Sequence, residues 1–430
     1  MKGKITEIAF KAIITVIILV TSISNFTSLA GNPSDIRRPV NLNSCLSNEK
    51  SDEPALYGLD EKVLLFMQNW ELKGLSLSIM KNDSLVYAKG YGWADEEKKV
   101  KMQASNIMRV ASVSKLITAT GIMLLQEEGL LSLKDKVFGE EGILKDEVYS
   151  SAIKDSNYYS ITIEDLLRHK AGFTSKGGDP MFSTRAIIVR EKLNRPPDLL
   201  TLIKNSLKKD LDYIPGTSQA YSNFGYLLLS RIIEEVSGES YEAFIKRKLL
   251  EPIGCIDFHI AGNYYKDRLK NEVRYYTAPN DKKVPEYTNS GRRVSRCYGG
   301  NDIHNLSGAG AWVASTPELA LFVASINGRS EIPDIIRKES LDAMIEYFDK
   351  DTFSLGWNDT NPETGWIRTG TFSGTSALIK YFPDGECWIL LTNTSTCKGA
   401  AFSRYTSALF DELREEYSKK IPRRNFFYGE

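Results

Sequence analysis

The chain has 430 residues, of which 42% are hydrophobic and 10% are aromatic, enough for one large domain or two closely packed ones. Lysine and arginine together number 55, as do aspartate and glutamate, so the formal net charge is zero. Nucleic-acid-binding proteins usually carry a basic excess or stripe, so no nucleic-acid partner is expected. A small-molecule or peptide substrate is easier to accommodate.

The first thirty residues have the pattern of an export signal. Three lysines precede an apolar run at 12–20, and small residues occupy 28 and 30. This pattern predicts a signal peptide at 1–30, because the run is shorter than the ~20 residues that span a bilayer. An uncleaved anchor is the alternative. Either reading places the remainder outside the cytoplasm, in the periplasm or the cell exterior, and no other segment is apolar enough to span a membrane.

Cysteine and histidine give no sign of a metal site. The five cysteines are an odd number, so at least one thiol is unpaired or pairs between molecules. Cys387 and Cys397 flank an apolar run and could form a disulfide after export, which the sequence leaves open. The three histidines are scattered without zinc-ligand spacing. No metal and no cofactor is expected.

The N-terminal half of the chain changes from linker to hairpin to helix. The polar, proline-containing segment 31–55 predicts a linker. Residues 75–91 predict a β-hairpin with its turn at 81–83, because the first arm alternates and the turn is polar. Residues 113–128 then have helical periodicity, and Gly129 follows as a stop signal.

Helices fill the middle of the chain and strands return near its end. Thr162 begins a segment that resembles a capping box, and the predicted helices are 224–236, 316–327 and 400–418. Residues 375–381 and 387–392 predict two strands joined by Pro383-Asp384-Gly385.

These elements predict an α+β domain at 56–420, followed by a C-terminal tail at 421–430. Strands from both ends of the domain form one antiparallel sheet flanked by helices, and a mostly helical lobe is inserted between them. A site at the seam between sheet and lobe is expected.

Ser112 and Lys115 form a Ser-x-x-Lys pair at the start of an apolar helix. The same spacing occurs at 47/50, 151/154 and 206/209, so the spacing alone is weak. At a helix start the two side chains share a face, and the free N–H groups there favour developing negative charge. A buried lysine with a lowered pKa could accept the serine proton. The alternative is a capping serine beside a solvated lysine.

Two further segments complete the predicted site. Tyr221 and Asn223 immediately precede an apolar helix, unlike the rival pair Tyr287 and Asn289 in a charged stretch. A phenol beside an ammonium could act as a general base, and Asn223 could bond both Lys115 and a substrate carbonyl. The alternative is a turn tyrosine followed by a helix cap.

The run Arg368-Thr369-Gly370-Thr371 stands just before the strand at 375. The arginine and hydroxyls could orient a carboxylate, and glycine lets a substrate approach the backbone. The N–H groups of Thr371 and Ser112 would form an oxyanion hole. The alternative is a plain turn into a strand.

Together these motifs resemble those of serine β-lactamase-related proteins, which include class C β-lactamases, D-Ala-D-Ala carboxypeptidases and related esterases. The resemblance covers roughly 57–415 and includes the segments 162–172 and 308–316. It implies the β-lactamase/transpeptidase-like fold, catalytic roles for Ser112, Lys115 and Tyr221, and a structural role for His169 rather than that of a general base. Arg368 departs from the family's usual lysine or histidine, which puts β-lactam turnover in doubt, since arginine cannot shuttle a proton.

The predicted function is that of an exported, monomeric serine hydrolase that forms an acyl-enzyme on Ser112. Its substrate would be an ester or amide, such as a β-lactam, a D-Ala-D-Ala-like peptide or a carboxylic ester. The alternative is a non-catalytic penicillin-binding-like sensor or binding protein on the same fold. A classical esterase is not expected, because no Gly-x-Ser-x-Gly motif occurs.

Overall fold

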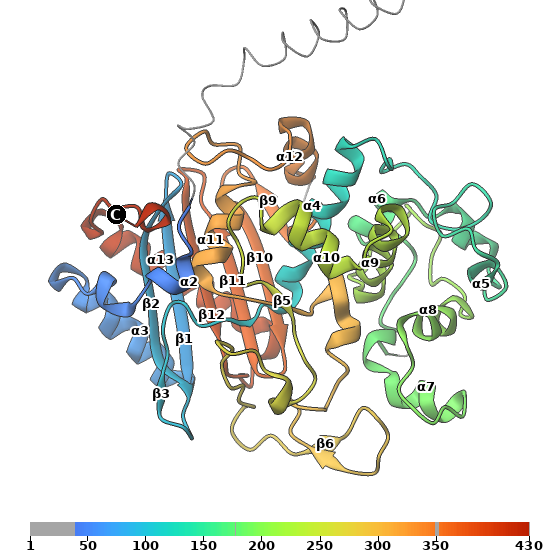
Figure 1. Cartoon of the computed structure of the whole chain (residues 1–430), viewed down its shortest axis with the longest axis horizontal. Helices are drawn as coiled ribbons and strands as arrows, with labels where there is room; N and C mark the ends of the chain where they lie inside the picture. Colours follow the sequence, from blue (N-terminus) through green and yellow to red (C-terminus); the bar gives the residue numbers. More distant parts are fainter. Residues whose placement is uncertain (1–38, 177, 349–351, 430) are drawn as a thin grey trace, which may run out of the picture. The chain divides into compact units, whose positions relative to one another are not determined.

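The computed structural model describes residues 39–176, 178–348 and 352–429 (Figure 1). The predicted signal peptide at 1–30 lies outside the described residues. A seven-stranded antiparallel sheet, with strand order β3-β2-β1-β12-β11-β10-β9, forms the centre of the domain. Its strands are β1 (Gly74–Lys81), β2 (Ser84–Asp95), β3 (Val100–Lys101), β9 (Asp359–Asn361), β10 (Gly365–Phe372), β11 (Thr375–Tyr381) and β12 (Glu386–Thr392).

Strands from the two ends of the domain pair at the middle of this sheet. β1 lies against β12, with Leu75 opposite Thr392 and Lys81 opposite Glu386. The antiparallel sheet predicted from N- and C-terminal strands is therefore confirmed. Short strands form two smaller sheets: β4 (Met108–Arg109), β8 (Trp312–Ala314) and β5 (His259–Ile260), and β6 (Val284–Pro285) with β7 (Arg293–Val294).

The first hairpin has the turn that its sequence predicts. Asn82 and Asp83 have φ angles of 46° and 56°, and two such residues between antiparallel strands are typical of a type I′ turn. The alternating serines of β1 are buried as well as the apolar residues. Ser76 and Ser78 lie 2.8 and 2.9 Å from the hydroxyl of Thr316. Both faces of this strand are therefore covered.

Helices cover both faces of the sheet. In Figure 1, α3 and α13 lie on one side, and α11 and the helical lobe on the other. The helices are α2 (Leu42–Cys45), α3 (Tyr57–Asn69), α4 (Ser114–Glu127), α5 (Glu147–Ser150), α6 (Ile163–Leu167), α7 (Thr184–Arg190), α8 (Leu199–Leu207), α9 (Asn223–Ser237), α10 (Tyr241–Ile245), α11 (Thr316–Ala324), α12 (Lys338–Ile345) and α13 (Phe402–Tyr417).

Capping residues determine where α6 and α9 of the helical lobe begin, and where α9 ends. Thr162 and Asp165 form the predicted capping box of α6. Ser222 caps α9 by accepting a hydrogen bond from the N–H of Gly225, and Gly238 ends the helix with a φ of 71°. Asn223 is consequently held in the first turn of α9.

Two terminal segments are more ordered than their composition predicts. Part of the predicted linker forms α2, and two 3₁₀ turns follow it before α3. Leu42 and Leu46 are buried in the core there. In the predicted tail, Phe426 and Phe427 are also buried in that core, and Phe427 accepts a backbone hydrogen bond from Val40. These apolar side chains are sparse in polar segments, so composition alone does not reveal that they pack.

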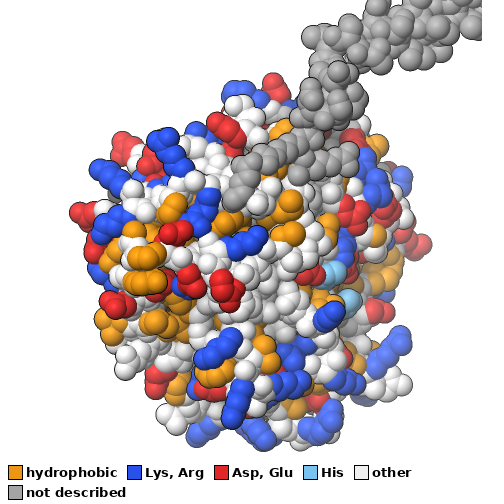
Figure 2. All heavy atoms as spheres, turned by 60° about the vertical axis from the view of Figure 1, so that its left-hand side comes forward, with side chains coloured by type: hydrophobic (Ala, Val, Ile, Leu, Met, Phe, Trp, Pro, Cys, Tyr) orange, Lys and Arg blue, Asp and Glu red, His pale blue; other side chains and the backbone are white. Residues whose placement is uncertain are grey.

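The surface shows mixed charge. Acidic and basic side chains are interspersed over the face drawn in Figure 2. None of the helices in the described part of the chain combines the length and the apolar character needed to cross a lipid bilayer.

Candidate active site

Ser112 lies in a tight turn between the large sheet and the helical lobe. It is the middle residue of a 3₁₀ turn, Ala111–Val113, that leads directly into α4. Ala111 has a φ of 49°, a left-handed conformation that non-glycine residues adopt only where surrounding structure holds them. The side chain of Ser112 does not cap α4, so the capping alternative does not apply. The serine instead lines a pocket.

Lys115 lies one turn further on and is completely buried. Its ammonium donates to Ser112 Oγ at 3.4 Å, to Asn223 Oδ1 at 2.7 Å and to the Ala309 carbonyl at 2.6 Å. Burial lowers the pKa of Lys115, and the charge of Arg368 adds to this while Tyr221 opposes it. The ammonium therefore has three acceptors, one of which is the serine hydroxyl. Its lowered pKa makes this lysine easier to deprotonate than a solvated lysine.

Tyr221 forms the opposite wall of the same pocket. The centre of its ring lies 4.8 Å from Lys115 Nζ, and 36% of the residue remains exposed. Burial disfavours the phenolate, but the charges of Lys115 and Arg368, with hydrogen bonds from Lys115 and Ser112, outweigh it. The resulting pKa of Tyr221 is about 8. A tyrosine with this pKa has an appreciable phenolate population near neutral pH and can act as a base.

A hydrogen-bond chain fixes the orientation of Asn223. Its Nδ2 donates to Asp179 Oδ2 at 2.7 Å, while its Oδ1 accepts from Lys115 at the same distance. The other carboxylate oxygen of Asp179 accepts from the N–H of Met181 at the start of a 3₁₀ turn. Asp179 was not predicted from the sequence; its only local signal is that it precedes Pro180 and caps this short turn.

His169 packs against the ring of Tyr221. Its Nδ1 accepts a hydrogen bond from the N–H of Ser222 at 3.1 Å, and its ring lies 4.5 Å from that of Tyr221. Burial, Lys115 and Arg368 together hold the pKa of His169 well below its usual range. This neutral, packed histidine has the geometry of the structural role that the family resemblance implies.

Arg368 points toward the backbone of Ser112 and not into the pocket. It is 1% exposed, and its Nε and Nη2 both donate to the Ser112 carbonyl, at 2.8 and 2.5 Å. The substrate-carboxylate role expected for Arg368 does not fit this placement. Gly370 lies against the same turn, because a Cβ atom there would be 2.3 Å from the Val110 carbonyl oxygen. Both residues support the turn from the sheet.

The outer edge of β10 presents backbone donors to the pocket. The N–H of Thr369 points to this edge, where it donates to Asn358 Oδ1 at 2.7 Å. Alternate residues of a strand direct their N–H groups to the same side, so the N–H of Thr371 also faces the edge. β9 pairs only with 365–367, which leaves that position uncovered by the sheet. Asn358 was not predicted from the sequence, because it belongs to no recognisable motif.

The pocket itself has a volume of about 250 Å³. Phe182 and Phe372 stack with ring centres 5.9 Å apart and form part of its wall. Its lining residues are Ala111, Ser112, Phe182, Tyr221, Asn223, Leu306, Ala309, Gly310, Asn358, Thr369, Thr371, Phe372 and Ala400. Five of the eight predicted site residues thus line this cavity, and a sixth, Lys115, reaches Ser112 through its ammonium.

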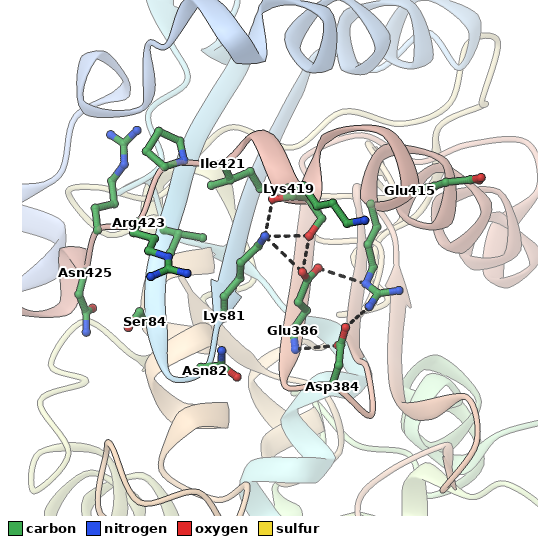
Figure 3. A pocket seen from close by; sticks show the side chains of 15 residues that line it. Lys81, Asn82, Ser84, Asp384, Glu386, Glu415, Lys419, Ile421, Arg423 and Asn425 are labelled. Atoms are coloured by element: carbon green, nitrogen blue, oxygen red, sulfur yellow. Dashed lines mark hydrogen bonds and ion pairs between the residues drawn. The ribbon is translucent and has the colours of Figure 1, made fainter.

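A larger hollow, of about 1060 Å³, opens at the opposite ends of the strands (Figure 3). Lys81 there contacts Glu386 and Ser418, and Arg414 also contacts Glu386. This hollow lies between two hairpin tips and the end of α13, and its charged residues Lys81, Asp384, Glu386 and Arg414 form ion pairs with one another. The smaller hollow is the one lined by Ser112 and Tyr221, with Lys115 in contact with Ser112.

Competing features of the sequence lie elsewhere. The rival Tyr287 accepts a hydrogen bond from Asn263 in a different loop region. All five cysteines are free thiols, so the bridge considered between Cys387 and Cys397 is not formed. Among the described residues, no group of three or more metal-ligating side chains gathers at one point.

Comparison with known proteins identifies relatives for most of the chain. Residues 60–406 match the family described as Beta-lactamase. Protein flp of Staphylococcus aureus (strain N315) is 28% identical over 323 residues, which are 74% of this chain and 58% of that protein. Penicillin-binding protein 4* of Bacillus subtilis (strain 168) is 30% identical over 327 residues, 72% of this chain and 65% of that protein. The chain therefore spans less than two thirds of the length of these curated relatives.

Solved structures share the fold at lower identity. The D-amino acid amidase from Ochrobactrum anthropi SV3 is 19% identical with a TM-score of 0.64, covering 89% of this chain and 100% of that chain. The D-alanine carboxypeptidase AmpC from Burkholderia cenocepacia is 16% identical with a TM-score of 0.62, covering 84% and 99%. The penicillin-binding protein homologue from Pyrococcus abyssi, described as octameric, is 24% identical with a TM-score of 0.58, covering 85% and 81%.

Proposed function

Since this chain belongs to the Beta-lactamase family, we propose that it is a serine hydrolase that cleaves an ester or amide through an acyl-enzyme on Ser112. The observation that carries the proposal is the placement of Lys115 Nζ 3.4 Å from Ser112 Oγ, in a site where the pKa of Tyr221 is about 8. A nucleophile and a base within reach of each other at one pocket are the minimum that covalent catalysis requires.

The proposed acylation proceeds with balanced proton transfer. The Tyr221 phenolate, held by Lys115, takes the hydroxyl proton of Ser112 as Oγ bonds to the substrate carbonyl carbon. The N–H groups of Ser112 and Thr371 stabilise the resulting oxyanion, and each such donor contributes a factor of roughly 10²–10³ in rate where measured. Tyr221 then returns the proton to the leaving group as its bond to carbon breaks. Water hydrolyses the ester of Ser112 by the reverse sequence.

We further propose that the protein acts outside the cytoplasm on a small-molecule or peptide substrate, without a metal or cofactor. The apolar start of the sequence supports export. The described part of the chain completes the proposed acid–base chemistry with its own side chains, which supports catalysis by protein groups alone. We predict a monomer, and the mass of the purified protein measured by analytical ultracentrifugation would test this prediction.

The decisive experiment compares Ser112→Ala with Ser151→Ala in hydrolysis of para-nitrophenyl acetate. Ser151 belongs to another Ser-x-x-Lys pair and is exposed, so it is a matched control. We expect Ser112→Ala to lower kcat/KM to the background rate and Ser151→Ala to match the wild type. Equal activity of the Ser112 variant would reject this site. A stable adduct on Ser112 without turnover would favour the alternative, a penicillin-binding-like sensor.

A further inference from the structure

We infer that this active site accepts esters or amides whose leaving group is uncharged and discriminates against a leaving group that carries a free carboxylate. The inference rests on the proposed function and narrows its substrate class. It comes from the two cations nearest Ser112, Lys115 and Arg368, and from Thr369, whose donors are already engaged by protein acceptors.

The arginine closest to the nucleophile is unable to bind a substrate carboxylate. Arg368 is 1% exposed, and the fork formed by its Nε and Nη2 is directed at the Ser112 carbonyl. A two-pronged arginine–carboxylate pair requires that fork to face the ligand. Releasing it would also free the turn that carries the nucleophile.

Two further residues beside Ser112 have their donors committed as well. Lys115 has its three protons directed at Ser112, Asn223 and Ala309. Thr369 donates both its N–H and its hydroxyl to Asn358 Oδ1, at 2.7 and 3.2 Å. A carboxylate entering here would lose its water and gain few charge-assisted hydrogen bonds in return, which is costly.

The walls of the pocket suit an uncharged group. Among the described lining residues there is no lysine, arginine or histidine, and Phe182, Leu306 and Phe372 supply apolar surface. Asn358 lines the pocket too, and its Nδ2 is a neutral donor suited to a carbonyl or amide oxygen. The pocket therefore combines apolar surface with polar side chains that, in the part of the chain the structure describes, include no lysine, arginine or histidine.

The next cation along the surface is also paired. A neighbouring hollow of about 410 Å³ shares Thr371 and Phe372 with this pocket and contains Arg296. Asp281 lies 3.3 Å from Arg296 in that hollow. A substrate carboxylate that reached Arg296 would meet this aspartate as a competitor, so the discrimination extends beyond the edge of the pocket.

Two aryl acetates of the same shape test this inference. para-Acetoxybenzamide and para-acetoxybenzoate differ only in a neutral amide or a carboxylate on the leaving phenol. Each kcat/KM is divided by the rate constant for hydroxide hydrolysis of the same ester, which removes their difference in intrinsic reactivity. We expect the corrected value for the benzamide to exceed that for the benzoate by at least about tenfold.

Charge variants test the cause. Asn358→Lys places a cation at the pocket wall and should reduce the benzamide preference several-fold, whereas Asn361→Lys adds the same charge on β9 outside the pocket and should leave the ratio unchanged. Equal corrected rates for the two esters in the wild type, both abolished in Ser112→Ala, would overturn the inference and leave the proposed function intact. If neither ester is cleaved in a Ser112-dependent manner, the proposed function itself fails and the inference falls with it.

Discussion

Asp179 holds the side-chain amide of Asn223 by its nitrogen, 2.7 Å away, so that the amide oxygen faces the ammonium of Lys115. An asparagine amide has a donor end and an acceptor end, and a carboxylate can accept only from the donor end. The relationship between these two residues therefore determines which end of the amide Lys115 meets. It also places a negative charge near Lys115, which opposes part of the lowering of the lysine's pKa by burial.

Removing this carboxylate should misplace the lysine. We expect Asp179→Ala to lower kcat/KM by roughly ten- to a hundredfold, because small displacements of catalytic groups have effects of this size. Asp179→Asn should recover part of the loss, since its amide oxygen can still accept from Asn223. Asp212→Ala, at a nearby acidic residue, is the control, and equal rates in both alanine variants would contradict this role.

The activity should rise with pH as Tyr221 ionises. The positive charges of Lys115 and Arg368 outweigh the burial of Tyr221 and bring its pKa to about 8. If its phenolate is the base, kcat/KM for a neutral ester increases with pH and levels off above about 8. Tyr221→Phe should remove this rise and lower the rate by about 10²–10⁴-fold. Tyr287→Phe, at the rival motif, should keep the profile; a similar loss in that variant would argue against Tyr221.

Two variants of Arg368 separate its charge from its geometry. Arg368→Gln removes a positive charge that lowers the pKa of Tyr221, so the pH–rate profile should shift to higher pH. Arg368→Lys keeps the charge but replaces the two-pronged contact with a single donor, so the rate should fall with little shift in the profile. Stopped-flow measurement of kcat/KM across pH distinguishes these effects. Identical profiles in the two variants would show that the charge of Arg368 does not act on Tyr221.

Lys115 should make stability depend on pH. Its folded pKa lies below the unfolded value of 10.5, so the unfolded chain binds more protons between those values. Stability linked to this group therefore rises as pH rises toward 10.5. Lys115→Met should lack this dependence and should lose hydrolysis. Parallel melting temperatures of the variant and the wild type over this range would contradict the buried, shifted lysine.

The close contact at Gly370 should be intolerant of a side chain. A Cβ atom there would lie 2.3 Å from the Val110 carbonyl oxygen, within a backbone contact that cannot yield cheaply. We expect Gly370→Ala to reduce the free energy of unfolding by about 1–3 kcal/mol, as overpacking does. Gly225→Ala is a matched control in α9, where the nearest atom is 3.6 Å away and alanine favours the helix. Chemical denaturation measures both, and an unaffected Gly370 variant would contradict the predicted clash.

Local signals predicted much of the scaffold. The turn at Asn82 and Asp83, the capping box at Thr162 and the stop at Gly129 each depend on residues within a few positions of one another, and all three form. The sheet was predicted because its strands cluster at both ends of the domain. These features need little knowledge of distant packing.

Long-range partners were harder to predict. Asp179 and Asn358 lie in loops, and only the fold brings them to Asn223 and Thr369. The direction of Arg368 depends on which face of β10 meets the turn that contains Ser112, and the composition of the strand does not reveal this. Dependence on long-range packing also explains why part of the segment 31–55 is helical and not a linker. Leu42 in this segment is buried by contacts with the core, which its local sequence does not reveal.

The pairing of β1 with β12 has a consequence for biosynthesis. A ribosome-bound chain that ends before β10 already contains the serine, lysine and tyrosine, but it lacks both the arginine that grips the serine carbonyl and the threonine amide facing the pocket. The contacts around the Ser112 turn are therefore completed only by strands from the C-terminal part of the domain. If Ser112 is the nucleophile, as proposed, we expect a chain that ends before β10 to show no hydrolysis.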